Sequence, residues 1–286
     1  MNINITTDSA ADLPIELCEK YKIKVIPLRV YDEEGNEYFD GETLSTLQLF
    51  NDMKIGKVYK TSLPSYESIK NVLETYAMSN TPLIHLSLTG ELSGTHQAVK
   101  LVFNELKEQY LDWNAEIFDT KCGSIGEGII VIEAARLANE GATKEVLLSH
   151  IQFLSNHMEH IITVDDLQYF VRGGRVSKFQ GFIGGLLNIK PILHLKDGVL
   201  TPFEKLRGTK KTFERILSII EKRGDDLKNQ TIGIAHADNI QIANQLKEEI
   251  VKRFGCDKFI INSIGASIGA HAGPGAYGVF FLNKKR

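Results

Sequence analysis

The sequence lacks the motifs with which proteins usually hold nucleotides. It contains no GxxxxGK[ST] phosphate loop, and no GxGxxG follows a predicted strand. The glycine-containing run at 123–128, GSIGEG, has a different spacing. We therefore expect no nucleotide to bind to this chain, and no cofactor is predicted.

Basic residues are not in excess, and long apolar runs are absent. The chain has 33 Lys and Arg against 36 Asp and Glu, a net charge of −3, which argues against nucleic acid as a partner. No apolar run approaches the roughly 20 residues of a membrane-spanning helix. The N-terminus has neither the basic nor the apolar region of a signal peptide. These absences predict a globular cytoplasmic protein.

Cysteine is scarce, and its positions do not suggest a metal site. Cys18, Cys122 and Cys256 lie far apart, without a CxxC or zinc-type spacing, so we expect free thiols in a reducing compartment. His157 and His160 form HxxH, which is at most half of a ligand set. Their position at the end of a predicted helix favours a solvated surface, and no metal is predicted.

What the sequence does contain is a regular alternation of strands and helices. Strands are predicted at 3–7, 24–31, 83–88, 115–119, 160–164, 231–235, 258–264 and 277–281, with a hairpin at 189–203 around Lys196-Asp197-Gly198. Helices are predicted at 13–21, 44–53, 129–138, 143–157, 208–222 and 240–254, and after Pro64 and Thr95. An apolar glycine-rich segment occupies 179–187.

This order indicates an α/β protein whose N-terminal half is a mainly parallel sheet with helices on both faces. The chain is long enough for two medium domains. We place their boundary near residue 160, which predicts an α/β domain at 1–159 and a second at 160–286. No extended exposed apolar pattern stands out, so we expect a monomer.

Small polar residues follow several of the predicted strands. Asp8-Ser9, Ser93-Gly94-Thr95 and Asp119-Thr120 all come at a strand's carboxyl end, where ligands bind in parallel sheets. Any such sheet places loops at this edge, so the position alone is compatible with a structural role.

The stretch at 81–99 is the best candidate for an anion site. A buried strand ends in Ser93-Gly94-Thr95, and this turn opens a helix. Unpaired N–H groups at a helix start, together with two hydroxyls, can hold a carboxylate or a phosphate. An ordinary N-cap is the simpler interpretation. A second hydroxyl cluster, Thr61-Ser62 followed by Ser65, also precedes a helix.

Two further segments combine glycine with residues that contact ligands. Arg172 and Arg175 flank a diglycine, and such a loop can present two guanidinium groups to an anion or an acidic partner; a solvated turn with an internal salt bridge is the alternative. His271 lies in a glycine-rich run near the C-terminus, where glycine permits close backbone approach. A single histidine can equally be a structural residue.

Taken together, these segments resemble the DegV family of bacterial fatty-acid-binding proteins. Each motif is common by itself, but their order and spacing are specific, and they extend over essentially the whole chain. The matching positions are Thr6, Asp8 and Ser9 after the first strand, residues 61–65 (TSLPS), Ser93-Gly94-Thr95, Asp119-Thr120, residues 169–175 (YFVRGGR), Lys190-Pro191 and residues 271–275 (HAGPG).

The resemblance implies two α/β domains with one long-chain fatty acid in an apolar tunnel between them. It further implies that the protein presents the fatty acid carboxylate to a separate fatty acid kinase, which makes an acyl-phosphate for phospholipid synthesis. Such a carrier is not itself an enzyme, and its use of exogenous fatty acids allows transient contact with a membrane.

The family's residue roles carry over to the matching positions. By resemblance, Thr61 and Ser93 donate hydrogen bonds to the carboxylate, and the other head-group residues lie beside it. Arg172 and Arg175 would lie near the tunnel mouth, where basic surface meets the kinase. The implied head-group site consists of Thr61, Ser62, Ser93, Gly94, Thr95 and His271.

One alternative of a different class remains: a hydrolase or transferase that acts on a small carboxylated or phosphorylated metabolite. It would use Ser93 or His271 chemically, although Ser93 lacks the GxSxG context. A long apolar tunnel supports the carrier, whereas an open polar crevice with a titratable pair in contact supports the enzyme.

Overall fold

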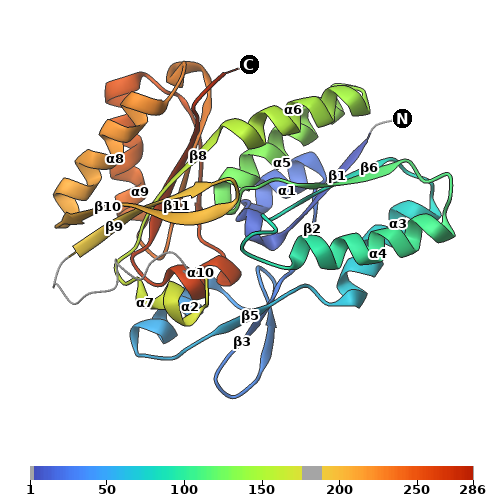
Figure 1. Cartoon of the computed structure of the whole chain (residues 1–286), viewed down its shortest axis with the longest axis horizontal. Coiled ribbons are helices and arrows are strands. Elements are labelled where there is room, and N and C mark those ends of the chain that lie inside the picture. The colour runs from blue at the N-terminus through green and yellow to red at the C-terminus, as the bar shows by residue number, and fades with distance from the viewer. Residues whose placement is uncertain (1–2, 176–188, 286) are drawn as a thin grey trace.

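The molecule contains two large sheets and a small third sheet, with helices between and around them (Figure 1). This computed structural model describes residues 3–175 and 189–285. The predicted glycine-rich segment at 179–187 lies outside the described residues. Within the described residues, no helix combines the length and apolarity needed to cross a bilayer.

The first sheet is entirely parallel, as predicted. Its strand order is β2-β1-β6-β7, and β6 is buried at every position. One apolar cluster joins a face of this sheet to α3 and α4, while the opposite face packs against α1 and α5. The elements are β1 (Asn4–Asp8), β2 (Lys24–Ile26), β6 (Leu83–Ser87), β7 (Ala115–Asp119), α1 (Ile15–Tyr21), α3 (Tyr66–Met78), α4 (Thr95–Gln109) and α5 (Ser124–Asn139).

Among the described residues, the second sheet has six strands in the order β10-β9-β8-β13-β11-β12, and only β11 and β12 are paired in parallel. The predicted hairpin is β9–β10, and both residues of its turn, Asp197 and Gly198, have positive φ. Helices α8 and α9 cover one face. The elements are α6 (Lys144–His157), β8 (Met158–Thr163), β9 (Ile189–Lys196), β10 (Val199–Arg207), α8 (Thr209–Arg223), η2 (Leu227–Asn229), β11 (Thr231–His236), α9 (Ile240–Phe254), β12 (Lys258–Ser263) and β13 (Tyr277–Leu282).

The prediction of one continuous strand at 24–31 is wrong. The chain leaves the parallel sheet after β2 and enters a small antiparallel sheet, ordered β4-β3-β5. Pro27 lies at the break, and its missing N–H cannot continue a strand ladder. The break directs β3 and β5 to the lower edge of Figure 1. The elements here are β3 (Arg29–Tyr31), β4 (Glu37–Phe39), α2 (Thr46–Lys54) and β5 (Lys60–Ser62).

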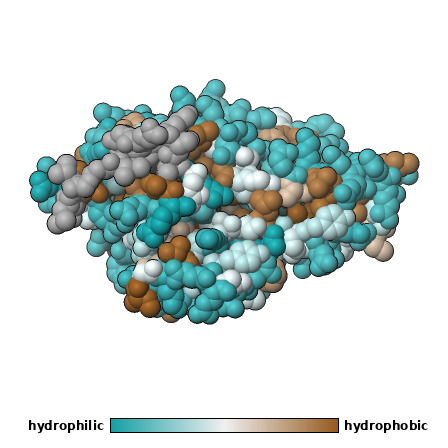
Figure 2. All heavy atoms as spheres, turned by 60° about the horizontal axis from the view of Figure 1, so that its bottom comes forward, coloured by the Kyte–Doolittle hydropathy of each residue, from teal (hydrophilic) through white to brown (hydrophobic). Residues whose placement is uncertain are grey.

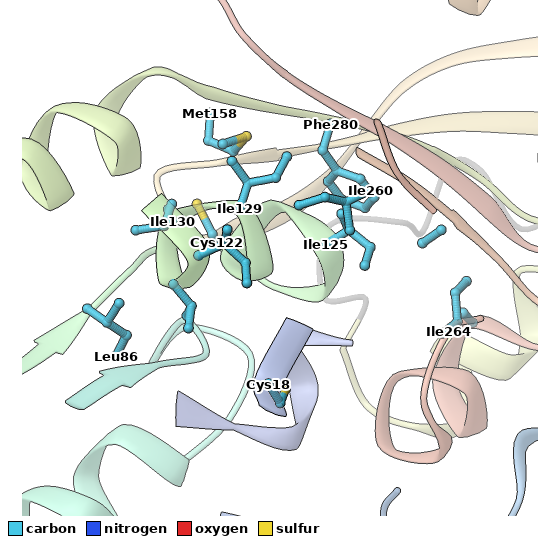
Figure 3. Close-up of a cluster of buried hydrophobic side chains, with 14 of the residues drawn as sticks. Cys18, Leu86, Cys122, Ile125, Ile129, Ile130, Met158, Ile260, Ile264 and Phe280 are labelled. Atoms are coloured by element: carbon cyan, nitrogen blue, oxygen red, sulfur yellow. The ribbon is translucent and has the colours of Figure 1, made fainter. Parts of the chain in front are cut away.

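Helix α5 lies between the two large sheets. We expected it to begin at Ile129, but it begins at Ser124 and includes Gly126 and Gly128 of the GSIGEG run. These glycines allow close packing: a Cβ at Gly126 would lie 2.4 Å from Nε2 of His160, and one at Gly128 would lie 2.7 Å from a backbone oxygen of Ala11. Figure 3 shows isoleucines of α5 between Leu86 of the first sheet and Phe280 of the second. Cys18, Cys122 and Cys256 are buried free thiols, as predicted.

Two buried carboxylates attach the short helix α10 (Ala266–Ala272) to the N-terminal half of the chain. Asp40 accepts hydrogen bonds from the Ala266 N–H (2.6 Å) and the Ser267 hydroxyl (2.5 Å). Asp12, which follows η1 (Ser9–Ala11), accepts from the Gly265 N–H (2.8 Å). Burial raises the pKa of both carboxyl groups. Because α10 carries His271, these bonds determine where that side chain lies.

We predict that Asp40→Asn lowers the free energy of unfolding by about 1–3 kcal/mol, because an amide has one acceptor oxygen and the carboxylate uses both. Since the folded-state pKa of Asp40 is raised, its contribution is greatest in acid and declines as the pH increases through that pKa. The difference in unfolding free energy between wild type and variant should therefore narrow as the pH rises above about 4, the ordinary pKa of an aspartate, and urea unfolding measures it. Asp112→Asn, at an exposed position, is the control; equal stabilities of the two variants would contradict the prediction.

Candidate functional site

An apolar cavity lies where the two halves of the chain meet. Its wall combines residues that follow β6 with residues of β8, β9 and β10, so neither large sheet forms it alone. Its glycine and polar residues are Gly123, Thr61, Ser93, Ser124, His160, Arg175, Ser267 and His271. Its apolar residues are Leu28, Leu88, Leu92, Ile162, Phe170, Leu195, Leu200 and Ile268.

Thr61 and His271 meet in this wall, although 210 positions separate them in the sequence: Oγ1 of Thr61 lies 2.7 Å from Nε2 of His271. Burial, reinforced by the charge of Arg175, lowers the pKa of His271 to about 4. The imidazole is therefore neutral near pH 7. When it donates its proton to Thr61, the threonine hydroxyl proton is free to bind an acceptor in the cavity.

Ser93 precedes Gly94, the N-cap residue of α4, and combines a structural contact with a place in the cavity wall. Its Oγ accepts a hydrogen bond from the Thr95 N–H (3.2 Å) and lies 2.8 Å from the Thr95 hydroxyl, so it stabilises the start of α4. It also lines the cavity. This structural contact does not exclude a ligand contact, because a hydroxyl that accepts a hydrogen bond from the backbone still carries a proton to donate.

The other predicted head-group residues lie around the cavity without lining it. Neighbouring residues of a strand point to opposite faces, so Ser62 points away from the cavity that Thr61 lines. The Ser62 hydroxyl accepts a hydrogen bond from Nη2 of Arg29 (3.3 Å). Thr95 is buried against Ser93, and Gly94 is the N-cap residue of α4.

Asp8 and Asp119, the last residues of β1 and β7, have structural partners. Asp8 is fully buried and accepts from the N–H groups of Ala10 and Leu88, and burial raises its pKa to about 7. Asp119 forms an ion pair with Lys121 (2.8 Å). Neither residue lines the cavity, whereas Ser93 does. The polar residues predicted at the carboxyl edge of the sheet therefore include both structural and cavity-lining positions.

The two arginines of the predicted RGGR loop differ in their surroundings. Helix α7 (Gln168–Arg172) ends at Arg172, which is exposed and stacks on Tyr169, with the guanidinium carbon 4.8 Å from the ring centroid. Arg175 lines the cavity, and its guanidinium donates to the backbone oxygens of Leu92 (3.2 Å) and Gly173 (2.5 Å). Within the described residues neither arginine forms a salt bridge, so the expected alternative of an internal ion pair is not observed there.

His160 does not lie on a solvated surface, and that expectation was wrong. It is 2% exposed, and its Nε2 accepts from the Gly123 N–H (3.4 Å) in the cavity wall. Burial lowers its pKa to about 4. Ser124 and Ser267 also line the cavity, and no sequence motif indicated either of them. Among residues 3–175 and 189–285, no group of three His, Cys, Asp or Glu side chains could hold a metal.

Comparison with known proteins gives one consistent match. A family model described as "Uncharacterised protein, DegV family" matches residues 2–284. A DegV domain-containing protein of Caldanaerobacter subterraneus subsp. tengcongensis is 34% identical over 99% of both chains. A Thermotoga maritima relative named fatty acid-binding protein is also 34% identical, over 100% of both chains.

Solved structures agree with the sequence matches. The structure of a fatty-acid-binding DegV family protein from Thermus thermophilus has a TM-score of 0.88 and 31% identity, and the match covers 98% of this chain and 99% of that one. The predicted α/β fold of this family is thereby confirmed. The chain belongs to the DegV family.

Proposed function

We propose that this protein binds one long-chain fatty acid, with the acyl chain in the apolar cavity and the carboxylate at Thr61 and Ser93. The observation that supports this proposal best is the composition of the cavity wall: apolar side chains from both halves of the chain, together with neutral donors at Thr61, Ser93 and His271. The relatives from T. maritima and T. thermophilus, described as fatty-acid-binding proteins, support the same ligand class.

Burial of the acyl chain can supply most of the affinity. At ~0.8 kcal/mol per methylene, about 14 methylenes contribute roughly 11 kcal/mol before the costs of ordering and association. The carboxylate needs several donors to offset its own desolvation. In this proposal Thr61 and Ser93 donate hydrogen bonds to the carboxylate. His271 orients the Thr61 hydroxyl, and Thr95 holds the Ser93 hydroxyl in place. Ser62 and Gly94 flank the head group.

We further propose that the bound acid is a substrate for a separate fatty acid kinase. A carboxylate oxygen would bond to the terminal phosphorus of a nucleoside triphosphate held by the kinase, while the nucleoside diphosphate leaves, giving an acyl-phosphate for phospholipid synthesis. Arg172 and Arg175 would contact the kinase. In this proposal the protein is a cytoplasmic, monomeric carrier for exogenous fatty acids and not an enzyme. Its domains divide near residue 160.

The arrangement of Ser93 and His271 does not favour the hydrolase or transferase alternative. A nucleophilic serine needs a base within hydrogen-bonding reach. The partner of the Ser93 hydroxyl is Thr95, and the partner of Nε2 of His271 is Thr61.

Mass spectrometry of the purified protein, first native and then after solvent extraction, tests the ligand directly. We expect one fatty acid per chain, retained because the apolar wall makes its release unfavourable. If no lipid is found, even after incubation with saturated and unsaturated long-chain acids, the carrier function is wrong.

We predict that Thr61→Ala and Ser93→Ala each weaken fatty acid binding about tenfold, since each removes a hydrogen bond to a buried charge. Competition with a fluorescent fatty acid measures the affinity, and circular dichroism checks folding. Thr75→Ala, which removes an exposed hydroxyl on α3, is the matched control and should bind normally. Unchanged binding in both cavity variants would contradict the head-group assignment.

We predict that Arg172→Ala binds fatty acid normally but is phosphorylated several-fold more slowly in a reconstituted kinase reaction. Arg172 is exposed and does not line the apolar cavity, so its loss leaves the acyl chain's contacts intact. Arg253→Ala on α9, whose side chain pairs with Glu214 and Glu249, is the control. Equal turnover of Arg172→Ala and wild type would exclude Arg172 from the kinase contact.

A further inference from the structure

The apolar cavity has two ends that differ in their polar residues. Thr61, Arg175 and His271 line both the cavity and an adjoining cleft, so they mark the end where the proposed carboxylate lies. We call it the head-group end. It meets the face of α2, β5 and α7, which Figure 2 turns toward the reader and which is mostly hydrophilic.

His160 lies at the opposite end of the cavity, which we call the distal end. It lines the cavity but not the adjoining cleft. Ile162, which also lines the cavity, follows His160 by two positions, a rise of about 7 Å along β8 in the direction of α7 and Arg175. A ligand group beside His160 therefore belongs to the middle or distal part of an acyl chain, and not to its carboxylate.

His160 presents a hydrogen-bond acceptor to the start of α5. Its Nδ1 lies 3.3 Å from the backbone oxygen of Met158, which can only accept, so Nδ1 carries a proton. Burial lowers the pKa of His160 to about 4, so near neutral pH the ring has this one proton and Nε2 has a lone pair. The Gly123 N–H donates to that lone pair over 3.4 Å, which exceeds the usual length of about 2.9–3.0 Å.

Packing explains where the His160 ring lies but does not require an imidazole. The ring packs edge-on against Phe280, with 5.2 Å between the centroids, and against Gly126. Figure 3 shows Phe280 beside the first turns of α5, where Ile125 is labelled. An apolar side chain could fill this space, whereas a polar ring in an apolar wall costs free energy unless its hydrogen bonds are well made. A ligand group can improve the weak bond of Nε2.

A hydroxyl group is the ligand chemistry that suits this pair. It can donate its proton to Nε2 of His160 and accept from the Gly123 N–H, and both residues line the cavity. A carboxylate has no proton to donate to Nε2. Ser124 and Ser267, which also line the cavity, are bonded to Asp12 and Asp40 (2.5 Å each).

We propose that His160 and the Gly123 N–H form a hydroxyl-binding site at the distal end of the cavity, so that the protein takes long-chain fatty acids that are hydroxylated on the middle or distal part of the acyl chain. This inference rests on the proposed fatty acid function and names the ligand class more closely. The carboxylate stays at Thr61 and Ser93. His160 is then a specificity-determining residue, because a hydroxyl buried without a partner weakens binding.

The test compares ligands with the same chain length on the full-length protein. The ligands are octadecanoate, its 10-hydroxy and 12-hydroxy derivatives, and the matching 10-oxo and 12-oxo acids, each in competition with a fluorescent fatty acid. His160→Leu removes the acceptor, and His160→Gln retains an acceptor oxygen. His157→Leu, outside the cavity at the end of α6, is the control, and circular dichroism checks folding.

We expect at least one hydroxy acid to bind the wild type as tightly as octadecanoate or more tightly. Its oxo counterpart, which has no proton to donate to Nε2, should bind about three- to tenfold more weakly than the hydroxy acid. His160→Leu should weaken binding of that hydroxy acid about tenfold and leave octadecanoate unchanged. His160→Gln should retain part of the preference, and His157→Leu should behave as wild type.

Three results would overturn the proposal. In the first, both hydroxy acids bind the wild type at least about tenfold more weakly than octadecanoate, as expected for a buried hydroxyl without a partner. In the second, the hydroxy and oxo acids bind equally. In the third, His160→Leu changes the affinities for octadecanoate and the hydroxy acids by the same factor. The first two need no variant, so they decide even if His160→Leu does not fold.

Failure of the proposed fatty acid function gives a different result. Octadecanoate itself would then not bind to the wild type, and the hydroxyl-binding site would fail with it. Tight binding of octadecanoate together with weak binding of both hydroxy acids would overturn only the hydroxyl-binding site.

Discussion

The arrangement of this molecule depends on the burial of α5 between two large sheets. A helix that packs on both sides needs small residues where neighbouring atoms approach closely. Gly126 leaves room for the His160 side chain, and Gly128 leaves room for the backbone oxygen of Ala11. Because α5 contacts both sheets, it sets their separation. The ends of β6 and the strands β8–β10 consequently face each other across one cavity.

The second constraint is the cost of placing a carboxylate beside apolar surface. Burying an unpaired charged group costs free energy of desolvation. Neutral hydrogen-bond donors that are held in place by their own partners can therefore bind a carboxylate without adding a second buried charge. The protein uses hydroxyls in this way: His271, neutral because burial lowers its pKa to about 4, contacts Thr61, and Thr95 contacts Ser93. Positively charged side chains lie beside the cavity instead. Lys57 and Arg172 line a second cleft that adjoins it, and both remain exposed to water.

Helix α10 connects the N-terminal half of the chain to the cavity wall. Its start is held by Asp12 and Asp40 from the N-terminal half, and its last turn carries His271 into the cavity wall. Gly173 permits the close approach of α7, since a Cβ there would lie 2.0 Å from Nδ1 of His271. The geometry of the candidate site is therefore set by buried acids and by a glycine that do not themselves contact the cavity.

Features that depend on neighbouring residues could be predicted from the amino-acid sequence alone. The periodicity of α9 predicted its bounds, Ile240–Phe254, and Asp197-Gly198 located the hairpin, because helix and turn preferences act within a few positions. The family motifs also identified Thr61, Ser93 and His271 as candidates. Other features are evident only in the folded molecule: Pro27 separates β2 and β3 into different sheets, α5 extends back to Ser124, and His160 is buried. The fold likewise places Thr61 2.7 Å from His271. These features depend on packing between segments far apart in the chain, which local preferences do not encode.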